Sequence, residues 1–366
     1  MTRSVALLGH GFAARAHANA LARLPMFFPD APSVERSVLV GRDPDRAAAA
    51  ADRLGFARAT TDLDGALADV DALYVAAPND RHAAASTAAL DRDVAVLCEK
   101  PLAPTVDAAE RMARAADRSG AVAGTAFNYR FSPPTRAARR LISAGDLGTV
   151  RRVRAHYLQD WLVDPDAPWS WRLDADRAGS GALGDLSAHS VDLVSFLLDD
   201  RVERVAGDLQ TVVDERPAPD GDGTRPVTVD DAATVRARFA GGARATLEAS
   251  RVATGHRNTH RVAVEGDEGA VRFDPGQPNE MAVCRDPTDG FETVDLTDPG
   301  GPYADRWWPP GHALGWEHAV VHESAAFLDC VAAGEPFRPS FADGLAVQRV
   351  LGAVERAAAE GSWVAV

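Results

Sequence analysis

The sequence contains a single lysine, Lys100, so 38 (39 − 1) of its basic residues are arginine. A GC-rich genome explains a bias toward arginine, alanine, glycine and aspartate. Adaptation to a salt-rich cytoplasm, in which dense carboxylates keep a halophilic protein hydrated, is a compatible explanation. Under either pressure we expect the remaining lysine to supply chemistry that arginine cannot, because an ammonium is a compact charge whose pKa shifts readily.

Cysteine is also scarce. Cys98, Cys284 and Cys330 are odd in number and far apart, which excludes a disulfide framework and offers no zinc-binding spacing, so we expect a cytoplasmic protein. No apolar run reaches the roughly 18 residues that a membrane-spanning helix needs. The short apolar run before Gly9 is not typical of a signal peptide.

Positive charge is outnumbered by negative charge. The net charge is 39 − 53 = −14, which repels phosphate backbones and anionic lipid, so neither nucleic acid nor a membrane is an expected partner. The length of 366 residues suggests about two domains. We expect one at residues 1–130 and the other at residues 131–366.

The first predicted domain alternates short apolar runs with alanine-rich helical segments, which is typical of a doubly wound parallel sheet in an α/β fold. The predicted strands are residues 4–8, 37–40, 72–76, 94–98 and 122–126, and the predicted helices are residues 13–24, 44–54, 80–90 and 106–119.

The second predicted domain has consecutive strands joined by glycine-rich turns, which favours an antiparallel sheet. The predicted strands are residues 150–159, 202–213, 227–239, 243–252, 261–265 and 270–273. The predicted helices are residues 136–143, 185–198, 316–332 and 341–359, and polar loops are expected at residues 217–226 and 286–310.

The first strand ends in Gly9-His10-Gly11-Phe12-Ala13-Ala14, a G-x-G-x-x-A sequence that precedes a helix. Small residues permit a tight turn and let backbone N–H groups approach a pyrophosphate at the helix N-terminus. The pattern predicts a dinucleotide site that includes Gly9, Gly11, Phe12 and Ala13; a plain tight turn is the alternative.

The end of the second strand bears on which dinucleotide binds. An acidic residue there holds the ribose 2′-hydroxyl of NAD, but this sequence has Gly41 followed by Arg42. That pattern leaves room for a 2′-phosphate with Arg42 as its partner, so the cofactor is NAD or NADP with a slight preference for NADP. Alternatively, Arg42 stacks on adenine and Asp43 reaches the ribose.

Further candidate residues follow the later strands, where a dinucleotide would run along the carboxyl edge of the sheet. Lys100 lies at this edge, and Glu99 beside it could orient it or hold a ribose hydroxyl. For His82, local packing is as good an explanation as cofactor contact. The additional predicted cofactor residues are Ala77, Pro78, Asn79, His82, Glu99, Lys100 and Asn128.

In the second domain, a glycine-rich segment at residues 179–184 runs into Asp185 and His189. Residues four apart share one face of a helix, and glycines let a substrate lie close to the helix start. This spacing is also common in surface pairs. His318 and His322 have the same spacing, but no third ligand accompanies them, so no metal is expected.

Taken in order, these elements resemble the glucose–fructose oxidoreductase / inositol dehydrogenase / MocA family over essentially the whole chain. The resemblance is nearest to a sugar-oxidising branch with levoglucosan and inositol dehydrogenases. It is carried by the G-x-G-x-x-A turn, Pro78–His82, Glu99–Pro101, Asn128–Arg130, Tyr157–Trp161, Trp171–Arg172, Gly184–Asp185 with His189, Trp307–Pro310 and Ser340–Gly344.

The resemblance implies a Rossmann domain followed by an α/β domain with an open, mostly antiparallel sheet, one face of which is often an oligomer interface. A homodimer or homotetramer is therefore expected. It also implies that Lys100 bonds the reacting hydroxyl, that His189 takes its proton and that Asp185 holds a neighbouring hydroxyl. The predicted substrate-binding residues are Lys100, Tyr129, Gln159, Trp171, Arg172, Asp185 and His189.

The predicted function is NAD(P)-dependent oxidation of a secondary hydroxyl of a sugar or cyclitol to a ketone. Such a reaction needs a base for the O–H proton, a hydride acceptor and a cation beside the oxygen. A neutral histidine and a lysine fit the first and last roles. An NAD-dependent glycoside hydrolase of the same fold and a non-catalytic sensor are the alternatives, and intact Lys100 and His189 argue against the sensor.

Overall fold

The structure is a computed structural model that describes residues 2–219, 221 and 223–366. It consists of two compact units. Unit 1 comprises Met1–Asn128 and Glu317–Ala346, and unit 2 comprises Tyr129–Trp316 and Val347–Val366. Among the described residues, no helix is long and apolar enough to cross a membrane.

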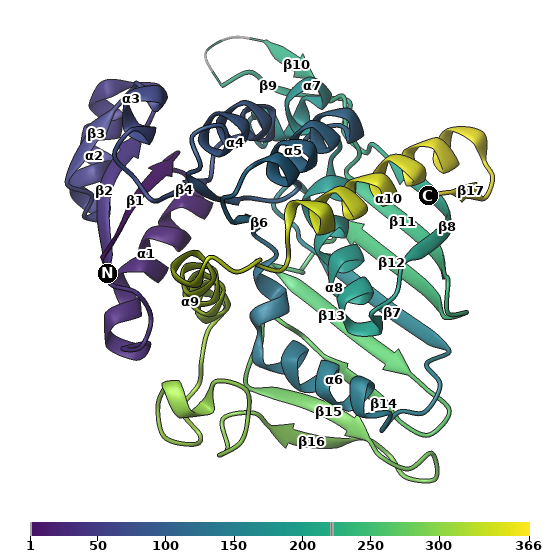
Figure 1. Cartoon of the computed structure of the whole chain (residues 1–366). Coiled ribbons are helices and arrows are strands. Elements are labelled where there is room, and N and C mark those ends of the chain that lie inside the picture. Colours follow the sequence, from purple (N-terminus) through teal and green to yellow (C-terminus); the bar gives the residue numbers. More distant parts are fainter. Residues whose placement is uncertain (1, 220, 222) are drawn as a thin grey trace. The chain divides into compact units, whose positions relative to one another are not determined.

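Unit 1 contains a parallel sheet with the strand order β3-β2-β1-β4-β5-β6 (Figure 1). This is the order of a doubly wound dinucleotide-binding sheet, so the predicted N-terminal fold is confirmed. The short edge strand β3 was not predicted from the sequence. The strands are β1 (Arg3–Leu8), β2 (Val34–Val40), β3 (Arg58–Thr60), β4 (Ala72–Val75), β5 (Ala95–Cys98) and β6 (Ala123–Thr125).

Local chemistry sets the ends of the unit 1 helices. The helix α2 begins after Asp43, whose carboxylate accepts the N–H of Arg46, and ends at Gly55 in the left-handed conformation. Leu73, Val75 and Val96 are buried in the core beneath these helices. The helices are α1 (Phe12–Phe27), α2 (Pro44–Leu54), α3 (Leu63–Leu67), η1 (Asn79–Arg81), α4 (His82–Leu90), α5 (Val106–Arg118) and α9 (Glu317–Ala333).

Residues 317–346 belong to unit 1, whereas the expected division placed everything after residue 130 in the second domain. The reason is that α9 packs along α1. The following segment extends the sheet edge, because Thr125 donates its N–H to Pro339 O at 2.9 Å and its hydroxyl to Ser340 O at 3.1 Å. The chain therefore returns to the N-terminal sheet near its end.

Unit 2 contains a second sheet with the strand order β16-β15-β14-β13-β7-β12-β11-β8-β17. Its neighbours pair antiparallel except β7 and β12, so the predicted mostly antiparallel sheet is confirmed. The strands are β7 (Arg152–Leu158), β8 (Val202–Gln210), β11 (Ala232–Phe239), β12 (Arg244–Ser250), β13 (Thr259–Glu265), β14 (Ala270–Phe273), β15 (Glu280–Cys284), β16 (Glu292–Asp295) and β17 (Val364–Ala365).

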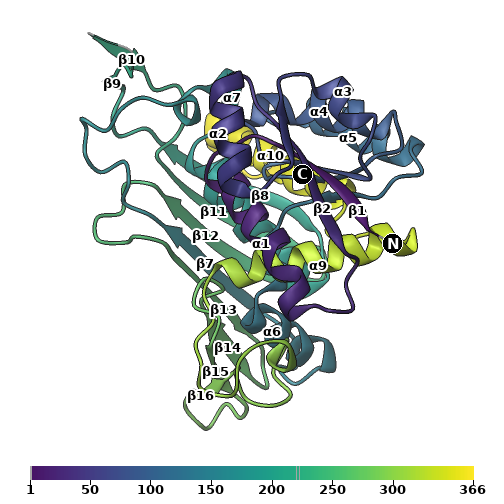
Figure 2. The same ribbon diagram turned by 90° about the vertical axis from the view of Figure 1, so that its left-hand side faces the viewer.

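Helices pack on one face of this sheet, because its strands alternate buried and exposed residues. In β12, for example, Leu247 is buried and Glu248 is exposed. The helices α6 and α8 contact each other, and each contacts a strand (Figure 1). Figure 2 shows α6 beside β14. The helical segments are η2 (Asn128–Phe131), α6 (Pro133–Ala144), η3 (Trp171–Leu173), α7 (Ala175–Ala178), η4 (Leu183–Ser187), α8 (Ala188–Leu198), η5 (Ala304–Arg306) and α10 (Phe341–Glu360).

Both segments expected to be loops contain strands. In the first, β9 (Glu215–Pro217) and β10 (Thr224–Pro226) pair antiparallel. In the second, β16 pairs with β15 at the edge of the sheet. Edge strands tolerate proline, because the N–H groups on their outer side do not take part in the hydrogen bonds of the sheet. Proline content alone was therefore a poor guide to these segments.

Candidate functional site

The turn after β1 requires glycine. Gly9 has φ +106°, and a Cβ built there would lie 2.4 Å from the carbonyl oxygen of Ala76, so only glycine fits. Gly11 is the N-cap residue of α1 and has no side chain that could cap the helix. The first turn of α1 therefore presents its N–H groups at the point between β1 and β4 where such sheets bind dinucleotides.

The end of β2 has little space for the acidic side chain that NAD-binding sheets carry. Gly41 is buried, and a Cβ there would lie 2.8 Å from the Cβ of Ala47 in α2. Asp43 accepts the N–H of Arg46 at 2.9 Å, which engages one carboxylate oxygen in capping α2. Arg42 is exposed beside them. At Gly41 the sheet therefore carries no carboxylate that could bond a ribose 2′-hydroxyl.

His82 lies fully buried between the loops that follow β4 and β5. Its Nδ1 is 3.1 Å from Pro101 O, and its Nε2 is 3.0 Å from Ala77 O. Burial lowers the pKa of His82, although the carbonyls and the Glu99 charge oppose that effect. A neutral ring donates to one carbonyl at a time. His82 thus links the two backbone segments.

Glu99 connects α1 to the end of β5. Its Oε1 lies 3.0 Å from Nε2 of His17, and its Oε2 accepts the backbone N–H of Lys100 at 3.1 Å. Burial raises the pKa of Glu99, but the hydrogen bond and charge of His17, together with Lys100, outweigh it and leave the pKa below its ordinary value. The carboxylate is therefore ionised and orients the lysine backbone.

The other predicted cofactor residues lie at the same edge of the sheet. Lys100 is half-buried after β5. Asn128 follows β6, and its buried Nδ2 has no hydrogen-bond partner among the described residues, as a ligand-binding amide would. Phe12 and Ala13 begin α1, and Ala77, Pro78 and Asn79 follow β4.

In unit 2, Asp185 lies on η4, a π-helical turn that continues into α8 and His189. The predicted regular helix over residues 185–198 is therefore wrong in its first turn. At the start of this turn, the Asp230 carboxylate accepts the N–H groups of Gly181 and Leu183. A π turn contains more residues than an α turn, so the four positions from Asp185 to His189 span close to one turn. Such turns are frequent at functional sites.

Aromatic side chains surround His189. Its ring lies 4.9 Å from that of Tyr129 and 5.9 Å from that of Tyr157, measured between centroids. The Tyr157 hydroxyl donates to Asn258 Oδ1 at 3.0 Å, so Tyr129 donates to Tyr157 at 3.0 Å. Gln159 donates to the same Asn258 oxygen at 2.8 Å. Burial raises the pKa of both tyrosines, so both hydroxyls remain neutral donors.

The two remaining predicted substrate residues stack on each other. The Arg172 guanidinium carbon lies 4.6 Å from the centroid of the Trp171 ring. Arg172 is exposed, and its carbonyl accepts a hydrogen bond from Arg251 at 3.3 Å. A cation held over an aromatic face fixes the orientation of both groups.

Sequence reasoning did not select Tyr157, Asn258 or Arg251 as site residues. Tyr157 precedes Gln159 by two positions, so strand alternation places both on one face, and that spacing could have revealed it. Arg251 directly follows β12 and Asn258 directly precedes β13, so their roles depend on strand pairing that no local pattern encodes.

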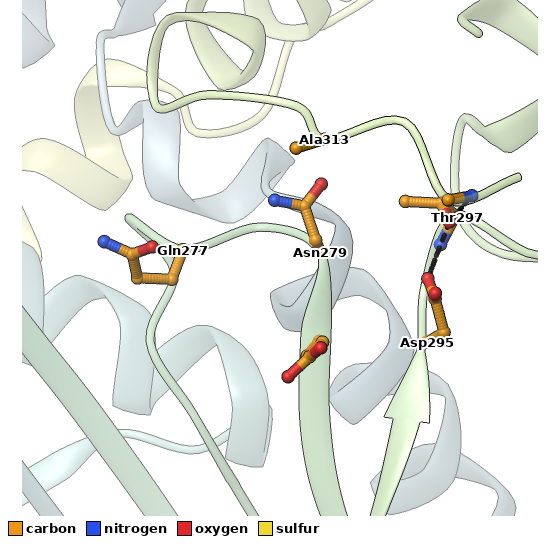
Figure 3. Close-up of a pocket in the computed structure, with 7 residues that line it drawn as sticks. Gln277, Asn279, Asp295, Thr297 and Ala313 are labelled. Atoms are coloured by element: carbon orange, nitrogen blue, oxygen red, sulfur yellow. Dashed lines mark hydrogen bonds between the residues drawn. The ribbon is translucent and has the colours of Figure 1, made fainter.

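Unit 2 also has a polar cavity of about 390 Å³ whose lining includes no residue predicted for the site (Figure 3). One lining carboxylate, Asp295, accepts the N–H and the hydroxyl of Thr297. These bonds lower the pKa of Asp295, so its charge is already stabilised within the protein. Among the described residues, no group of three or more histidine, cysteine or acidic side chains could hold a metal ion.

Comparisons with known proteins extend over the whole chain. Residues 3–127 match a model of the oxidoreductase family with an NAD-binding Rossmann fold, and residues 135–272 match the GFO/IDH/MocA C-terminal domain. A levoglucosan dehydrogenase from Pseudarthrobacter phenanthrenivorans is 37% identical over 99% of this chain and 98% of its own length.

Two further relatives bear on the ligands. A solved structure of levoglucosan dehydrogenase in complex with NADH and levoglucosan is 36% identical, with a TM-score of 0.96 over 100% of this chain and 99% of that chain. An NADP-dependent D-xylose 1-dehydrogenase from Haloarcula marismortui is 33% identical over 66% of this chain and 65% of its own length.

Proposed function

Because this chain belongs to the GFO/IDH/MocA family of oxidoreductases, we propose that it is an NAD(P)-dependent dehydrogenase that oxidises a secondary hydroxyl of a sugar or cyclitol to a ketone. The observation that carries the proposal is the position of the only lysine. Lys100 follows β5 in a sheet whose glycine turn suits a dinucleotide, and Glu99 fixes its backbone.

The residues of unit 1 fit the cofactor. A side chain at Gly9 would fill the space beside Ala76, and the N-cap residue of α1 is a glycine without a capping side chain. The N–H groups at Gly11, Phe12 and Ala13 would hold the pyrophosphate, and Arg42 would hold a 2′-phosphate. When bound, the nicotinamide supplies the hydride acceptor.

The chain's own groups supply the proton chemistry. His189 takes the hydroxyl proton as general base. The Lys100 ammonium stabilises the negative charge that develops on the substrate oxygen. Asp185 accepts a hydrogen bond from a neighbouring hydroxyl and orients the ring. Tyr129 restrains the His189 ring through their edge contact of 4.9 Å.

The experiment is a substrate screen that records formation of reduced cofactor by absorbance, with NAD and NADP tested separately. Levoglucosan, xylose and inositol come first, because relatives are named for them. We expect turnover of at least one sugar or cyclitol. His189→Ala should lower the rate by about 10²–10⁴-fold while cofactor binding stays within a factor of two or so. Net glycoside hydrolysis without reduced cofactor would contradict the proposal.

We also propose that the protein acts in the cytoplasm as a homodimer or homotetramer adapted to concentrated salt. Its cysteines are free, and its net charge is −14. Light scattering after size-exclusion chromatography tests the assembly. A melting temperature that rises from dilute buffer to molar KCl supports salt adaptation. An unchanged melting temperature would show that the composition reflects codon bias.

A further inference from the structure

Asn258 directly precedes β13, and one oxygen atom of its side chain accepts two hydrogen bonds. The Tyr157 hydroxyl donates to Asn258 Oδ1 at 3.0 Å, and Gln159 Nε2 donates to the same oxygen at 2.8 Å. Tyr157 lies in β7 and Gln159 directly follows that strand, so both donors come from the strand that pairs with β13. An amide oxygen has two lone pairs, and these two bonds use both.

The hydrogen atoms of this network point toward Asn258. A phenol has a single hydrogen, and that of Tyr157 lies on Asn258, so Tyr129 is the donor in its 3.0 Å contact with the Tyr157 hydroxyl. The Gln159 amide faces Asn258 with its nitrogen, and the second hydrogen of Nε2 stays at that end of the amide. The carbonyl oxygen of Gln159, Oε1, is therefore turned away from Asn258 and is able to accept a hydrogen bond.

Stacking fixes the tyrosine that holds Asn258. The rings of Tyr157 and His260 are nearly parallel, with centroids 4.4 Å apart, and His260 Nε2 lies 3.1 Å from Ser190 Oγ in α8. Both rings are buried. A buried and stacked ring holds its hydroxyl in place, so Asn258 and, through it, the Gln159 amide are positioned before a ligand binds.

Gln159 is the more exposed end of this network. Tyr129 and Tyr157 are buried, whereas Gln159 is half-buried. The same two tyrosine rings lie 4.9 and 5.9 Å from the His189 ring, measured between centroids. Gln159 and the candidate base are thus attached to one pair of aromatic side chains.

We propose that Asn258 is a specificity-determining residue of the sugar site: it turns the Gln159 amide so that Gln159 Oε1 accepts a hydrogen bond from a substrate hydroxyl. This inference rests on the proposed function, which places a sugar or cyclitol at Gln159. A carbonyl oxygen bonds a hydroxyl, which has a hydrogen to donate, but not an ether oxygen or a fluorine. The substrates are therefore polyols with a free hydroxyl at the position that meets Gln159.

The first measurement is the ¹⁵N–¹H NMR signal of the Gln159 side-chain amide, identified by its loss in Gln159→Glu. Asn258→Asp keeps an acceptor and should keep the slow proton exchange of the bonded Nε2 group, whereas Asn258→Leu should accelerate it about three- to tenfold. Asn258 is exposed, so neither change opens the core. Arg257→Leu is the matched control, because this exposed neighbour pairs with Asp160 at 3.1 Å and should leave the signal unchanged.

The second measurement is steady-state kinetics with the sugar that the substrate screen identifies and with analogues in which fluorine replaces one hydroxyl at a time. In the wild type, fluorine at one position should raise KM about three- to tenfold, as expected for one lost hydrogen bond. Asn258→Asp should keep this discrimination. In Asn258→Leu the KM of the parent sugar should rise to about that of the fluorinated analogue, with kcat within a factor of two or so and the cofactor Kd unchanged.

Two results would overturn the inference. If Asn258→Asp accelerates the amide exchange as much as Asn258→Leu does, Asn258 bonds Gln159 through its nitrogen and the carbonyl oxygen of Gln159 is not the outward group. Equal discrimination between the parent sugar and its analogues in the wild type and Asn258→Leu would show that Asn258 does not set specificity. Absence of wild-type turnover refutes the proposed function, whereas the NMR signals need no substrate and decide the orientation of Gln159 by themselves.

Discussion

The imidazole of His17 in α1 lies 3.0 Å from the carboxylate of Glu99 at the end of β5. The imidazole is almost fully buried, and its ring meets that of Tyr74 edge-on at a centroid distance of 5.3 Å. The helix that begins after the glycine turn Gly9–Gly11 is thereby linked to the residue preceding Lys100. We therefore expect cofactor binding to depend on the same contacts that fix the lysine backbone.

Replacing His17 should therefore affect stability and cofactor binding together. We expect His17→Leu to lower the free energy of unfolding by about 1.5–3 kcal/mol, because it removes a hydrogen bond to a charged group. His17→Gln keeps an N–H donor and should lose less. Urea unfolding measures the stability, and fluorescence titration measures the cofactor Kd. In a Glu99→Gln background the two His17 variants should differ little; an undiminished difference would show that His17 acts independently of Glu99.

His260 should make the protein less stable in mild acid. Burial lowers its pKa to about 3, in a site where it stacks on Tyr157 with centroids 4.4 Å apart and bonds Ser190 Oγ at 3.1 Å. In the unfolded chain His260 takes up a proton below about pH 6.5, whereas in the folded chain it does not. The contribution of neutral His260 to the free energy of unfolding is therefore fully present above pH 6.5 and declines as the pH falls toward 3.

The expected loss from His260 is about 2 kcal/mol between pH 6.5 and pH 5. His260→Phe keeps an aromatic ring for the stack and should flatten the stability profile in this range. His312→Asn is the control, because His312 is exposed. Its removal should leave the slope of the free energy of unfolding against pH unchanged. Urea unfolding at several pH values measures both. Equal slopes for the wild type and His260→Phe would mean that His260 is protonated in the folded state.

The parallel sheet and the glycine turn could be predicted because their determinants are local. Apolar runs alternate with helical segments, and Gly9 and Gly11 stand between a strand and a helix. The return of α9 to unit 1 could not be predicted. It depends on contacts between α1 and residues about 300 positions later, which leave no periodic pattern in either segment.

The candidate site also combines features set by local sequence with features set by long-range contacts. Asp185 and His189 were found by spacing, yet the π turn between them begins at N–H groups that bond Asp230, which lies more than 40 residues further along the chain. Asn258 joins Tyr157 and Gln159 only because β13 pairs with β7. Long-range register of this kind is set by tertiary packing, so single-sequence patterns identify the candidate groups but not their partners.

Cofactor choice should follow from the end of β2. Gly41 provides no carboxylate, and Arg42 is exposed where a 2′-phosphate would lie, so we expect NADP to be used at least as well as NAD. Arg42→Ala should lower kcat/KM for NADP and leave that for NAD nearly unchanged, while Arg53→Ala, at the far end of α2, changes neither. Initial-rate kinetics with both cofactors test this. A wild-type preference for NAD of about 100-fold, roughly 2.7 kcal/mol, would contradict it.

Lys100 offers the sharpest test, because the chain has no other lysine. An amine-selective reagent has only this side chain and the α-amino group as targets, so reductive methylation and peptide mass mapping can be interpreted residue by residue. Modification of Lys100 should parallel the loss of dehydrogenase activity, and saturating cofactor with substrate should protect both. Lys100→Arg should also lose activity, because a guanidinium keeps the charge but is bulkier and cannot make the same point contact. Full activity after complete modification of Lys100 would show that the lysine amine has no part in turnover and that the catalytic role belongs to another residue.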